Sequence, residues 1–365
     1  MTILAEPDTR PVAIPLRDDD HERVLIRQDP RSGLRIVVAV HSTALGPAIG
    51  GLRWKRYAGG LREALEDAMG LARTMTLKAS AAGLDTGGGK AVVIDDGRQE
   101  LREERLLEAA AVVDSLGGDY VTAEDIGTTT ADMDLIATRT RYVVGRSRER
   151  GGGGDPSPVT AETVLQAIRR GLGWAAGSPD LDGRSVGVVG LGKVGSVLAG
   201  KLAEEGASVV GCDLDPARAE RSADECGIAI APSAEAILGL ELDVLAPCAG
   251  GALVDEAVAR ALDCRVLAGA ANNPLAGRHV AEVLRDRGIL YVPDFLANCG
   301  GLIHVASEWH GDRGEHEQAH VERAMARLDA AIETAEASGQ TPLEVAEQQA
   351  LERVAAAAAT PLAAA

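Results

Sequence analysis

A strand, a glycine turn and the start of a helix follow one another near the middle of the chain, and few folds accommodate this combination. Residues 185–195 (SVGVVGLGKVG) form an apolar strand that ends in the pattern G-x-G-x-x-G. A helix pattern follows to Glu205, and a second strand, residues 208–212, ends at Asp213. This is the spacing of a βαβ unit whose glycines allow a tight turn and bring a pyrophosphate to a helix N-terminus. The pattern therefore predicts a doubly wound parallel sheet that binds a dinucleotide.

The dinucleotide contacts can be assigned to the turn and to the acidic residue after the second strand. In the turn we expect them at Gly190, Gly192, Lys193, Val194 and Gly195. Asp213 would accept hydrogen bonds from the adenosine ribose and repel a 2′-phosphate, so it favours NAD over NADP. The alternative is that Asp213 only caps a turn before Pro216.

Three further strands, residues 242–246, 265–268 and 290–292, are each followed by a loop of small residues with a polar group. In an open parallel sheet, ligands bind beyond the carboxyl ends of the strands. These loops therefore offer four candidate site residues: Asn272, Asn273, Asp294 and Asn298. Each of them alone is more simply explained as a turn residue, because Asn and Asp favour turns.

Residues 75–94 (MTLKASAAGLDTGGGKAVVI) hold two lysines in apolar, glycine-rich surroundings, although the chain has only five lysines in all. Burial and a neighbouring cation can bring a lysine to titrate near neutrality, which arginine does not do. Lys78 and Lys90 are therefore candidate functional groups. The plainer alternative is a buried strand after a turn, with Lys90 reaching the surface. We expect residues 87–89 to form a loop before a strand at 91–94, and residues 45–53 to form a glycine-rich loop.

Composition excludes several classes of protein. A length of 365 residues suits two domains. The net charge of −18 argues against nucleic acid and anionic membrane surfaces as partners. Five cysteines without a C-x-x-C pair are expected to be reduced thiols in a cytoplasmic protein. We find no apolar run of transmembrane length, no signal peptide pattern and no metal-ligand motif.

Residues 148–158 (RERGGGGDPSP) mark the clearest domain boundary, since four glycines and two prolines exclude the interior of an element. The second domain then opens with a helix from about Thr160, which we expect to be its N-cap. Near the C-terminus, one helix pattern is stopped by Gly339, and a capping box at Thr341 opens the last helix. Residues 1–20 and the alanine-rich tail are expected to be frayed.

Seven segments of the chain are similar to signature segments of the NAD-dependent amino-acid dehydrogenases. They are GPAIGGLRWKRY, MTLKASAAGLDTGGGKAVVI, YVTAEDIGTTTADMD, DPSPVTA, GLGKVG, AGAANNPLA and YVPDFLANCGGLIHVA, in consistent order between residues 22 and 310. Among the Glu/Leu/Phe/Val dehydrogenases, the chain most resembles the leucine, valine and phenylalanine branch. The resemblance implies a two-domain α/β homo-oligomer with a deep cleft. Residues 1–150 and about 318–365 would form the substrate-binding and oligomerisation domain, and residues 151–317 the Rossmann-type NAD domain.

The resemblance also implies a role for each matching residue. Lys90 would be the general base, and Asp125 the catalytic aspartate that passes a proton. Lys78 and Asn298 would hold the substrate carboxylate. The loop against the substrate would contain Gly50 and Gly51. The remaining cofactor contacts would come from Thr160, Ala246, Cys248 and Asn272.

The expected substrate class follows from two positions at which this chain has an apolar side chain and glutamate-specific relatives have a polar one. These relatives carry a lysine at the position of Ile49 and a serine at that of Val305, and an apolar pair would leave a buried γ-carboxylate unpaired. Leu302 and Ala123 would extend the apolar wall. We expect reversible oxidative deamination of an apolar L-amino acid, with Leu, Val and Ile favoured, to the 2-oxo acid and ammonia. A phenylalanine dehydrogenase is the alternative within the class.

The chain departs from the family pattern in three places, one of which is residues 50–53, where Gly-Gly-Leu-Arg replaces the more usual Gly-Gly-Thr-Arg. Residues 246–251 (APCAGG) are one residue shorter than the usual Ala-Pro-Cys-Ala-Leu-Gly-Gly, which would shorten the loop beneath the adenosine ribose. Cys299 stands where alanine is usual. The shortened loop is the one feature that favours a distant alternative, a non-catalytic relative that binds NAD or an amino acid.

Overall fold

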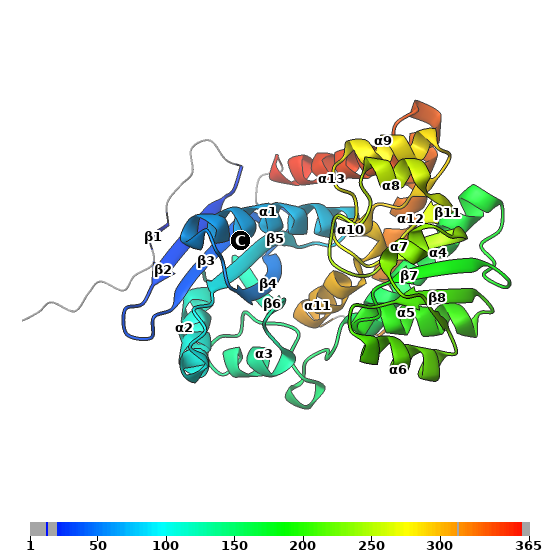
Figure 1. Ribbon diagram of the computed structural model, residues 1–365. Coiled ribbons are helices and arrows are strands. Elements are labelled where there is room, and N and C mark those ends of the chain that lie inside the picture. The colour runs from blue at the N-terminus through cyan, green and yellow to red at the C-terminus, as the bar shows by residue number, and fades with distance from the viewer. Residues whose placement is uncertain (1–11, 14–19, 312–313, 360–365) are drawn as a thin grey trace, which may run out of the picture.

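The computed structural model describes residues 12–13, 20–311 and 314–359 of the 365-residue chain. These residues form two six-stranded sheets, each covered by helices and lying side by side (Figure 1). The predicted two-domain α/β fold is thereby confirmed. Most of the predicted frayed arm and the tail after residue 359 lie outside the described residues, but Val12–Ala13 of that arm form strand β1, paired antiparallel with β2. No helix in the part of the chain described is long and apolar enough to cross a membrane.

The first sheet is mixed, with the strand order β1-β2-β3-β5-β4-β6. Its strands are β1 (Val12–Ala13), β2 (Arg23–Gln28), β3 (Arg35–Ser42), β4 (Ala48–Lys55), β5 (Gly87–Ile94) and β6 (Tyr120–Glu124). Its helices are α1 (Gly60–Ala81), α2 (Arg102–Asp114), preceded by a short 3-10 turn at Gln99–Leu101, and α3 (Thr130–Ile136). β3 pairs antiparallel with β5, whereas β4 runs parallel to both β5 and β6. Residues of β5, β4 and β6 therefore lie in register in the half of the sheet that ends at β6, with β4 between the other two strands.

Both glycine-rich segments that were predicted to be loops are strands. Residues 87–89 open β5, and residues 48–53 belong to β4. The glycines are needed for close packing: a Cβ atom on Gly88 would lie 2.1 Å from the backbone nitrogen of Thr76 in α1. The prediction was wrong because glycine is common in turns, whereas here it lets a helix backbone approach a strand.

The second sheet is parallel throughout, with the strand order β12-β11-β10-β7-β8-β9. Its strands are β7 (Ser185–Val189), β8 (Ser208–Cys212), β9 (Ala229–Ile230), β10 (Glu241–Pro247), β11 (Asp263–Leu267) and β12 (Leu290–Tyr291). The helices of this half are α4 (Ser157–Ala176), α5 (Lys193–Glu204), α6 (Pro216–Cys226), α7 (Ala234–Leu238), α8 (Glu256–Ala261), α9 (His279–Asp286), α10 (Asp294–Ala297) and α11 (Gly300–His310). This is the doubly wound order, with its switch point between β7 and β10.

The linker between the two sheets is held by a buried carboxylate. It contains a 3-10 turn, Arg148–Arg150. Glu308 of α11 accepts hydrogen bonds from the backbone N–H groups of Gly145 and Gly153 and pairs with Arg146 at 3.1 Å. Helix α4 begins at Ser157, so the prediction that Thr160 is its N-cap was wrong. The Thr160 hydroxyl instead donates to the carbonyl of Pro156 within the first turn.

The last two helices contact both halves of the molecule. α12 (Glu315–Ser338) lies against α4, where Arg170 pairs with Asp329. α13 (Pro342–Ala358) lies along α1 (Figure 1), and the hydroxyl of Ser80 donates to the carbonyl of Ala350 at 2.7 Å. The predicted ends are confirmed: Gly339 closes α12 in the left-handed conformation, and Thr341 forms the capping box of α13.

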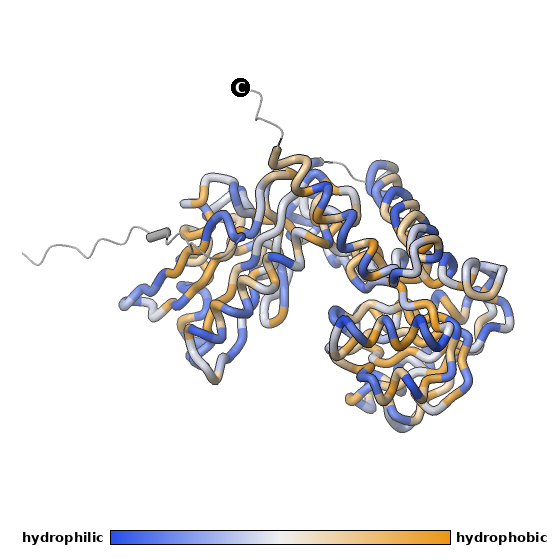
Figure 2. The backbone as a smooth tube through the Cα atoms, turned by 90° about the horizontal axis from the view of Figure 1, so that it is seen from above, coloured by the Kyte–Doolittle hydropathy of each residue, from blue (hydrophilic) through white to orange (hydrophobic). Residues whose placement is uncertain are grey.

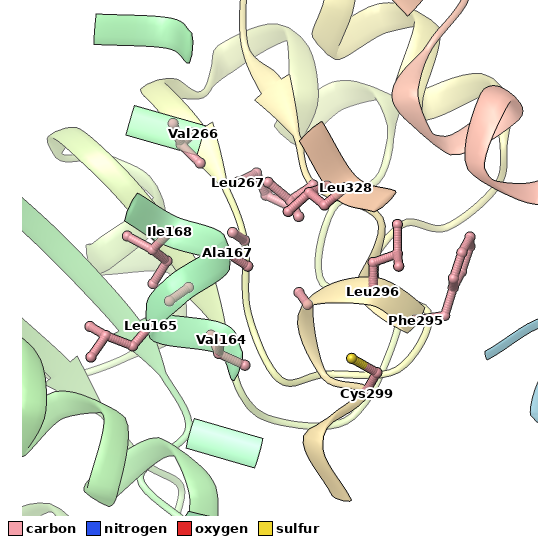
Figure 3. Packing of buried hydrophobic residues seen from close by; sticks show 14 of the residues in the cluster. Val164, Leu165, Ala167, Ile168, Val266, Leu267, Phe295, Leu296, Cys299 and Leu328 are labelled. Carbon is pink, nitrogen blue, oxygen red and sulfur yellow. The ribbon is translucent and has the colours of Figure 1, made fainter. Parts of the chain in front are cut away.

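Apolar residues run along the strands and alternate with polar ones along the helices (Figure 2). In the second half, α4 packs on β11, where Ile168, Val266 and Leu267 are fully buried. Figure 3 shows these side chains together with Leu328 of α12 and Cys299, which precedes α11. A Cβ atom on Gly171 would lie 2.7 Å from Val266, so a glycine in α4 sets this close contact. The core is aliphatic, as the 2% aromatic content requires.

Candidate active site

Lys90 and Asp125 form an ion pair inside the first sheet. Lys90 lies in β5 with 6% of its side chain exposed, and its Nζ is 2.9 Å from Oδ2 of Asp125. Arg53 of β4 donates from Nε to the same Oδ2 at 2.8 Å. The three residues meet because β4 pairs in parallel with β5 on one side and with β6, which ends just before Asp125, on the other. Lys90 therefore does not reach the surface as an unpaired cation.

Burial and neighbouring charges shift the pKa of both groups. Burial lowers the pKa of Lys90 below its ordinary value, and the charge of Arg53 adds to this effect against the opposing influence of Asp125. Burial acts to raise the pKa of Asp125, but the charges and hydrogen bonds of Lys90 and Arg53 outweigh it and hold that pKa low. A lysine with a lowered pKa beside an ionised carboxylate is suited to proton transfer.

Gly50 and Gly51 lie in β4 next to this pair. A Cβ atom on Gly51 would be 2.6 Å from Cβ of Asp125, and one on Gly50 would be 1.7 Å from the carbonyl oxygen of Gly89. The Tyr120 hydroxyl donates to the carbonyl of Gly50 at 2.7 Å. Only glycine at both positions allows β4 to pass this close to β5 and to Asp125.

Lys78 connects the two halves of the molecule. It lies in the last turn of α1, and its Nζ donates to Oδ1 of Asn272, in the loop after β11, at 3.2 Å. Nδ2 of Asn298 donates to the same Oδ1 at 3.0 Å. Burial lowers the pKa of Lys78; the charge of Lys90 acts in the same direction, and Asp294 and Cys299 oppose it. Three residues predicted from separate segments thus lie in one cluster.

The amide of Asn298 is only partly satisfied. Its Nδ2 also donates to the carbonyl of Ala270 at 3.1 Å, whereas Oδ1 is buried and has no hydrogen-bond partner among the described residues. Asn273 and Asp294 have a structural contact instead, because the backbone N–H of Asn273 donates to Oδ2 of Asp294 at 2.8 Å. The turn alternative therefore accounts for Asn273.

The four apolar residues predicted to face the substrate side chain are buried in one continuous hydrophobic cluster. They are Ile49, Ala123, Leu302 and Val305. Ile49 lies in β4 and Ala123 in β6, and the other two lie in α11. The parallel register pairs Gly51 with Ala123, two residues before Asp125, and so places Ala123 close to the Lys90–Asp125 pair along the chain.

A cavity of about 570 Å³ lies at the carboxyl ends of β7 and β8 and is lined by Gly190, Gly192, Asp213, Cys248 and Ala249, among others. Gly192 is the N-cap of α5, and a Cβ atom there would meet no atom within 4 Å, so the helix N-terminus is open to a ligand. By contrast, a Cβ on Gly195 would lie 1.9 Å from the carbonyl oxygen of Gly190, which explains the third glycine. These features fit a dinucleotide pyrophosphate.

Asp213 faces this cavity and also organises the loop. Its Oδ2 accepts from the backbone N–H of Leu191 at 2.9 Å, and its Oδ1 accepts from that of Asp215 at 2.8 Å. The capping alternative is therefore part of its role, but the residue also joins the glycine turn to the end of β8. Arg218 lies 3.8 Å from Oδ1.

The other predicted cofactor positions are more scattered. Lys193 and Val194 form the first turn of α5, where Lys193 is exposed, and Ala246 is buried in β10. Thr160 and Asn272 do not line the cavity at the glycine turn. A Cβ on Gly301 would lie 3.0 Å from the Thr160 hydroxyl, so Thr160 borders the start of α11. No group of three or more His, Cys, Asp or Glu side chains suited to a metal ion occurs in the described residues.

The sequence analysis missed two residues beside the ion pair, Arg53 and Asp67. Nη1 of Arg53 donates to both carboxylate oxygens of Asp67, at 3.2 and 3.1 Å. A signal was available, because Asp67 lies about three turns before Lys78 in α1 and so on the same face of that helix. Arg53 was noticed only as part of a glycine-rich segment.

The fold and the site define a two-domain oxidoreductase, with a dinucleotide-binding sheet beside a sheet that holds a buried lysine–carboxylate pair. The chain belongs to the Glu/Leu/Phe/Val dehydrogenase family. The family's dimerisation domain matches residues 21–142, and the glutamate/leucine/phenylalanine/valine dehydrogenase domain matches residues 218–360. A shorter match, to the coenzyme F420-dependent NADP oxidoreductases, covers residues 185–247. The predicted family is confirmed.

Individual relatives are similar over nearly the whole chain. A valine dehydrogenase of Streptomyces coelicolor is 45% identical over 344 residues, which cover 93% of this chain and 94% of the relative. A leucine dehydrogenase of Thermoactinomyces intermedius is 39% identical, covering 92% and 91%. The crystal structure of an L-tryptophan dehydrogenase from Nostoc punctiforme superposes with a TM-score of 0.80 at 33% identity, covering 93% and 98%. The chain thus lies within the predicted leucine/valine branch.

Proposed function

We propose that this enzyme catalyses the reversible NAD-dependent oxidative deamination of a branched-chain L-amino acid to its 2-oxo acid and ammonia. The observation that carries the proposal is the Lys90–Asp125 ion pair, which is 2.9 Å long and in which only 6% of the Lys90 side chain is exposed. The similarity to valine and leucine dehydrogenases supports the same substrate class.

In this proposal, Lys90 and Asp125 move the protons. Oxidation at Cα leaves an iminium, which water must attack, and a proton must then reach the departing nitrogen. Lys90, with its lowered pKa, takes a proton from the attacking water. Asp125, held ionised, passes a proton from the carbinolamine hydroxyl to nitrogen.

Lys78 is proposed to hold the substrate carboxylate. The Lys78 side chain is partly buried, and its hydrogen-bond partner among the described residues is the neutral Asn272 amide, so a carboxylate would be a stronger partner. Asn298 is proposed to assist. Its Nδ2 is engaged with Asn272 and backbone carbonyls, so donation to a carboxylate requires it to leave one of these acceptors.

The cofactor is proposed to be NAD, held at the N-terminus of α5 with its adenosine ribose at Asp213. When bound, NAD accepts the hydride that leaves Cα of the amino acid. The carboxylate of Asp213 would repel a 2′-phosphate, which supports NAD over NADP. The nearby Arg218 is paired with Asp213 and Asp215 and so offers less charge to a phosphate. Thr160, Ala246 and Cys248 are proposed to lie along the rest of the cofactor.

The apolar group of Ile49, Ala123, Leu302 and Val305 is proposed to select an aliphatic side chain. A single methyl or methylene changes selectivity by only about 1–3 kcal/mol, so valine, leucine and isoleucine would all be substrates at different rates. A preference for phenylalanine or tryptophan is the second candidate, favoured by the similarity to a tryptophan dehydrogenase.

We also propose that residues 1–150 and 318–365 form the substrate-binding and oligomerisation domain, residues 151–317 the NAD domain, and that a cleft separates them. The position of α13 along α1 supports the first assignment, whereas α12 also packs on α4 of the NAD domain. Assembly into a homo-oligomer is supported by the match to a dimerisation domain. A cytosolic location is supported by the five free thiols.

The test is NADH formation by the purified full chain at mildly alkaline pH. The substrates are L-valine, L-leucine, L-isoleucine, L-phenylalanine, L-tryptophan and L-glutamate, each with NAD and with NADP. We expect turnover of the aliphatic amino acids with NAD and none of glutamate. Glutamate turnover would contradict the role of the apolar group, and NADP preference would contradict that of Asp213. NAD binding without any turnover would favour the non-catalytic alternative.

A further inference from the structure

A row of alternating charges extends from the Lys90–Asp125 pair to the surface of the first sheet. Asp125 is bound by Arg53 at 2.8 Å, and Arg53 is bound by Asp67 at 3.1 Å. The Tyr57 hydroxyl donates to Oδ2 of Asp67 at 2.5 Å, and Nζ of Lys55 lies 4.0 Å from that oxygen. We propose that Arg53 and Asp67 are positioning residues, which hold the Asp125 carboxylate against Lys90 and balance the charge around that pair. This inference rests on the proposed function.

The position of Arg53 fixes the orientation of the carboxylate. Both Lys90 and Arg53 contact Oδ2 of Asp125, at 2.9 and 2.8 Å, so Oδ1 makes no ion pair with a described residue. A carboxylate held through one oxygen keeps the other available to exchange a proton with a substrate. The rigid guanidinium allows this, because Arg53 uses Nε for Asp125 and Nη1 for Asp67.

Asp67 in turn fixes Arg53 and offsets its charge. Arg53 has 14% and Asp67 24% of the side chain exposed, so solvent screens their interaction only in part. Without Asp67, two cations would face a single carboxylate. Burial and hydrogen bonding to Asp67 raise the pKa of Tyr57, so its hydroxyl stays protonated and donates to Asp67. The four charged residues come from β5, the end of β6, β4 and α1, and therefore depend on the packing of the whole first sheet.

The two residues have opposite effects on Lys90. Burial has the largest effect on the pKa of Lys90 and lowers it, and Asp125 opposes this effect. Of the two more distant charges, that of Arg53 lowers the pKa of Lys90 and that of Asp67 raises it. Lys78 faces the pair from α1, and Asp294 and Cys299 act on Lys78 from the second half of the molecule. Neutralising Arg53 should therefore raise the pKa of Lys90, and neutralising Asp67 should lower it. These shifts test whether the two charges reach Lys90, and the loss of kcat in Arg53→Lys, which keeps the charge, tests whether Arg53 orients Asp125.

The experiment measures the titration of Lys90 directly. Because the chain has only five lysines, protein labelled with ¹³C at lysine Cε gives few signals, and a Lys90→Arg variant assigns the one that matters. We expect the Lys90 midpoint to move up in Arg53→Gln and down in Asp67→Asn, each by on the order of one pH unit. Arg53→Lys keeps the positive charge but loses the branched guanidinium that contacts both Asp125 and Asp67, so the midpoint of the Lys90 titration should change little. Arg62→Gln removes an exposed cation from α1 and serves as the control.

Activity provides the second readout. The rising, low-pH limb of kcat/KM for NAD-dependent deamination should move with the Lys90 midpoint, because the base acts in its neutral form. In Arg53→Lys, kcat should fall about 10- to 100-fold because Asp125 is less well oriented. The inference would be overturned if the Lys90 midpoint moved in the same direction in Arg53→Gln and Asp67→Asn, or did not move in either variant. Asp67→Asn preserves the shape of the side chain, so this variant still tests the inference if Arg53→Gln does not fold. An unmodified enzyme without deaminase activity would refute the proposed function, while the Lys90 titration would still decide the inference.

Discussion

Replacing Gly88 by alanine should separate the two lysines of the site. A Cβ atom at Gly88 would lie 2.1 Å from the backbone nitrogen and 2.3 Å from the hydroxyl of Thr76, and 2.6 Å from the carbonyl oxygen of Ala72. Two of these atoms belong to the backbone of α1, so no side-chain rotation relieves the overlap. To reach an ordinary contact of 3.4 Å, α1 must withdraw from β5 by roughly 1 Å.

Lys78 moves with the helix, because it follows Thr76 by two residues in α1. A displacement of this size between binding and reacting groups costs about 100-fold in rate. Overpacking also destabilises the first sheet by about 1–3 kcal/mol. We therefore expect kcat/KM for L-valine and L-leucine to fall about 100-fold, while NAD binding to the second sheet is kept.

Steady-state NADH formation measures the first effect, and NAD titration followed by fluorescence measures the second. Gly70→Ala is the matched control: it lies in the same helix, is exposed, and its Cβ would meet nothing within 4 Å. Alanine there should leave kinetics unchanged and stabilise the helix by up to about 1 kcal/mol. A Gly88→Ala enzyme whose kcat/KM stays within about threefold of the parent would refute the reasoning.

The remaining predictions concern the base, the cofactor and the linker. Lys90→Met should lower kcat by about 10²- to 10⁴-fold without loss of NAD binding, and unchanged kcat would exclude Lys90 as the base. Because the pKa of Lys90 is lowered, kcat/KM for deamination should rise with pH and level off below about 10.4, the value of a free lysine; a pH–rate profile that first rises above that value would contradict this. Asp213→Ser should reduce the preference for NAD over NADP at least about tenfold, measured as the ratio of kcat/KM values. Glu308→Ala leaves two backbone N–H groups and Arg146 without their acceptor and should destabilise the protein by about 3–5 kcal/mol in thermal unfolding, and an unchanged melting temperature would exclude Glu308 as a linker anchor.

Local patterns in the sequence determined most of the second half of the molecule. The G-x-G-x-x-G turn, the strand before it and Asp213 predicted β7, α5 and β8, because a dinucleotide unit is contiguous in sequence and each part has a distinct period or residue type. The capping box at Thr341 and the stop at Gly339 were found for the same reason. Lys78 and Lys90 could be singled out because lysine is rare in this chain and both lie in an apolar, glycine-rich segment, whereas Asp125 and the separate roles of the three residues came from the similarity to a known family.

Packing between distant segments decided the rest. Whether residues 87–89 form a loop or a strand depends on the helix backbone that lies against Gly88. The sequence of residues 87–89 alone does not show which segment packs on them. The contacts of Lys78 with Asn272 and of Arg53 with Asp125 join residues that are far apart along the chain, and the contact of Arg53 with Asp67 joins a strand to a helix. Burial and these pairings set the pKa of Lys90 and the orientation of Asp125. The sequence names the candidate reacting groups, but only the folded sheet determines the electric field around them, because that field depends on distances between separate strands.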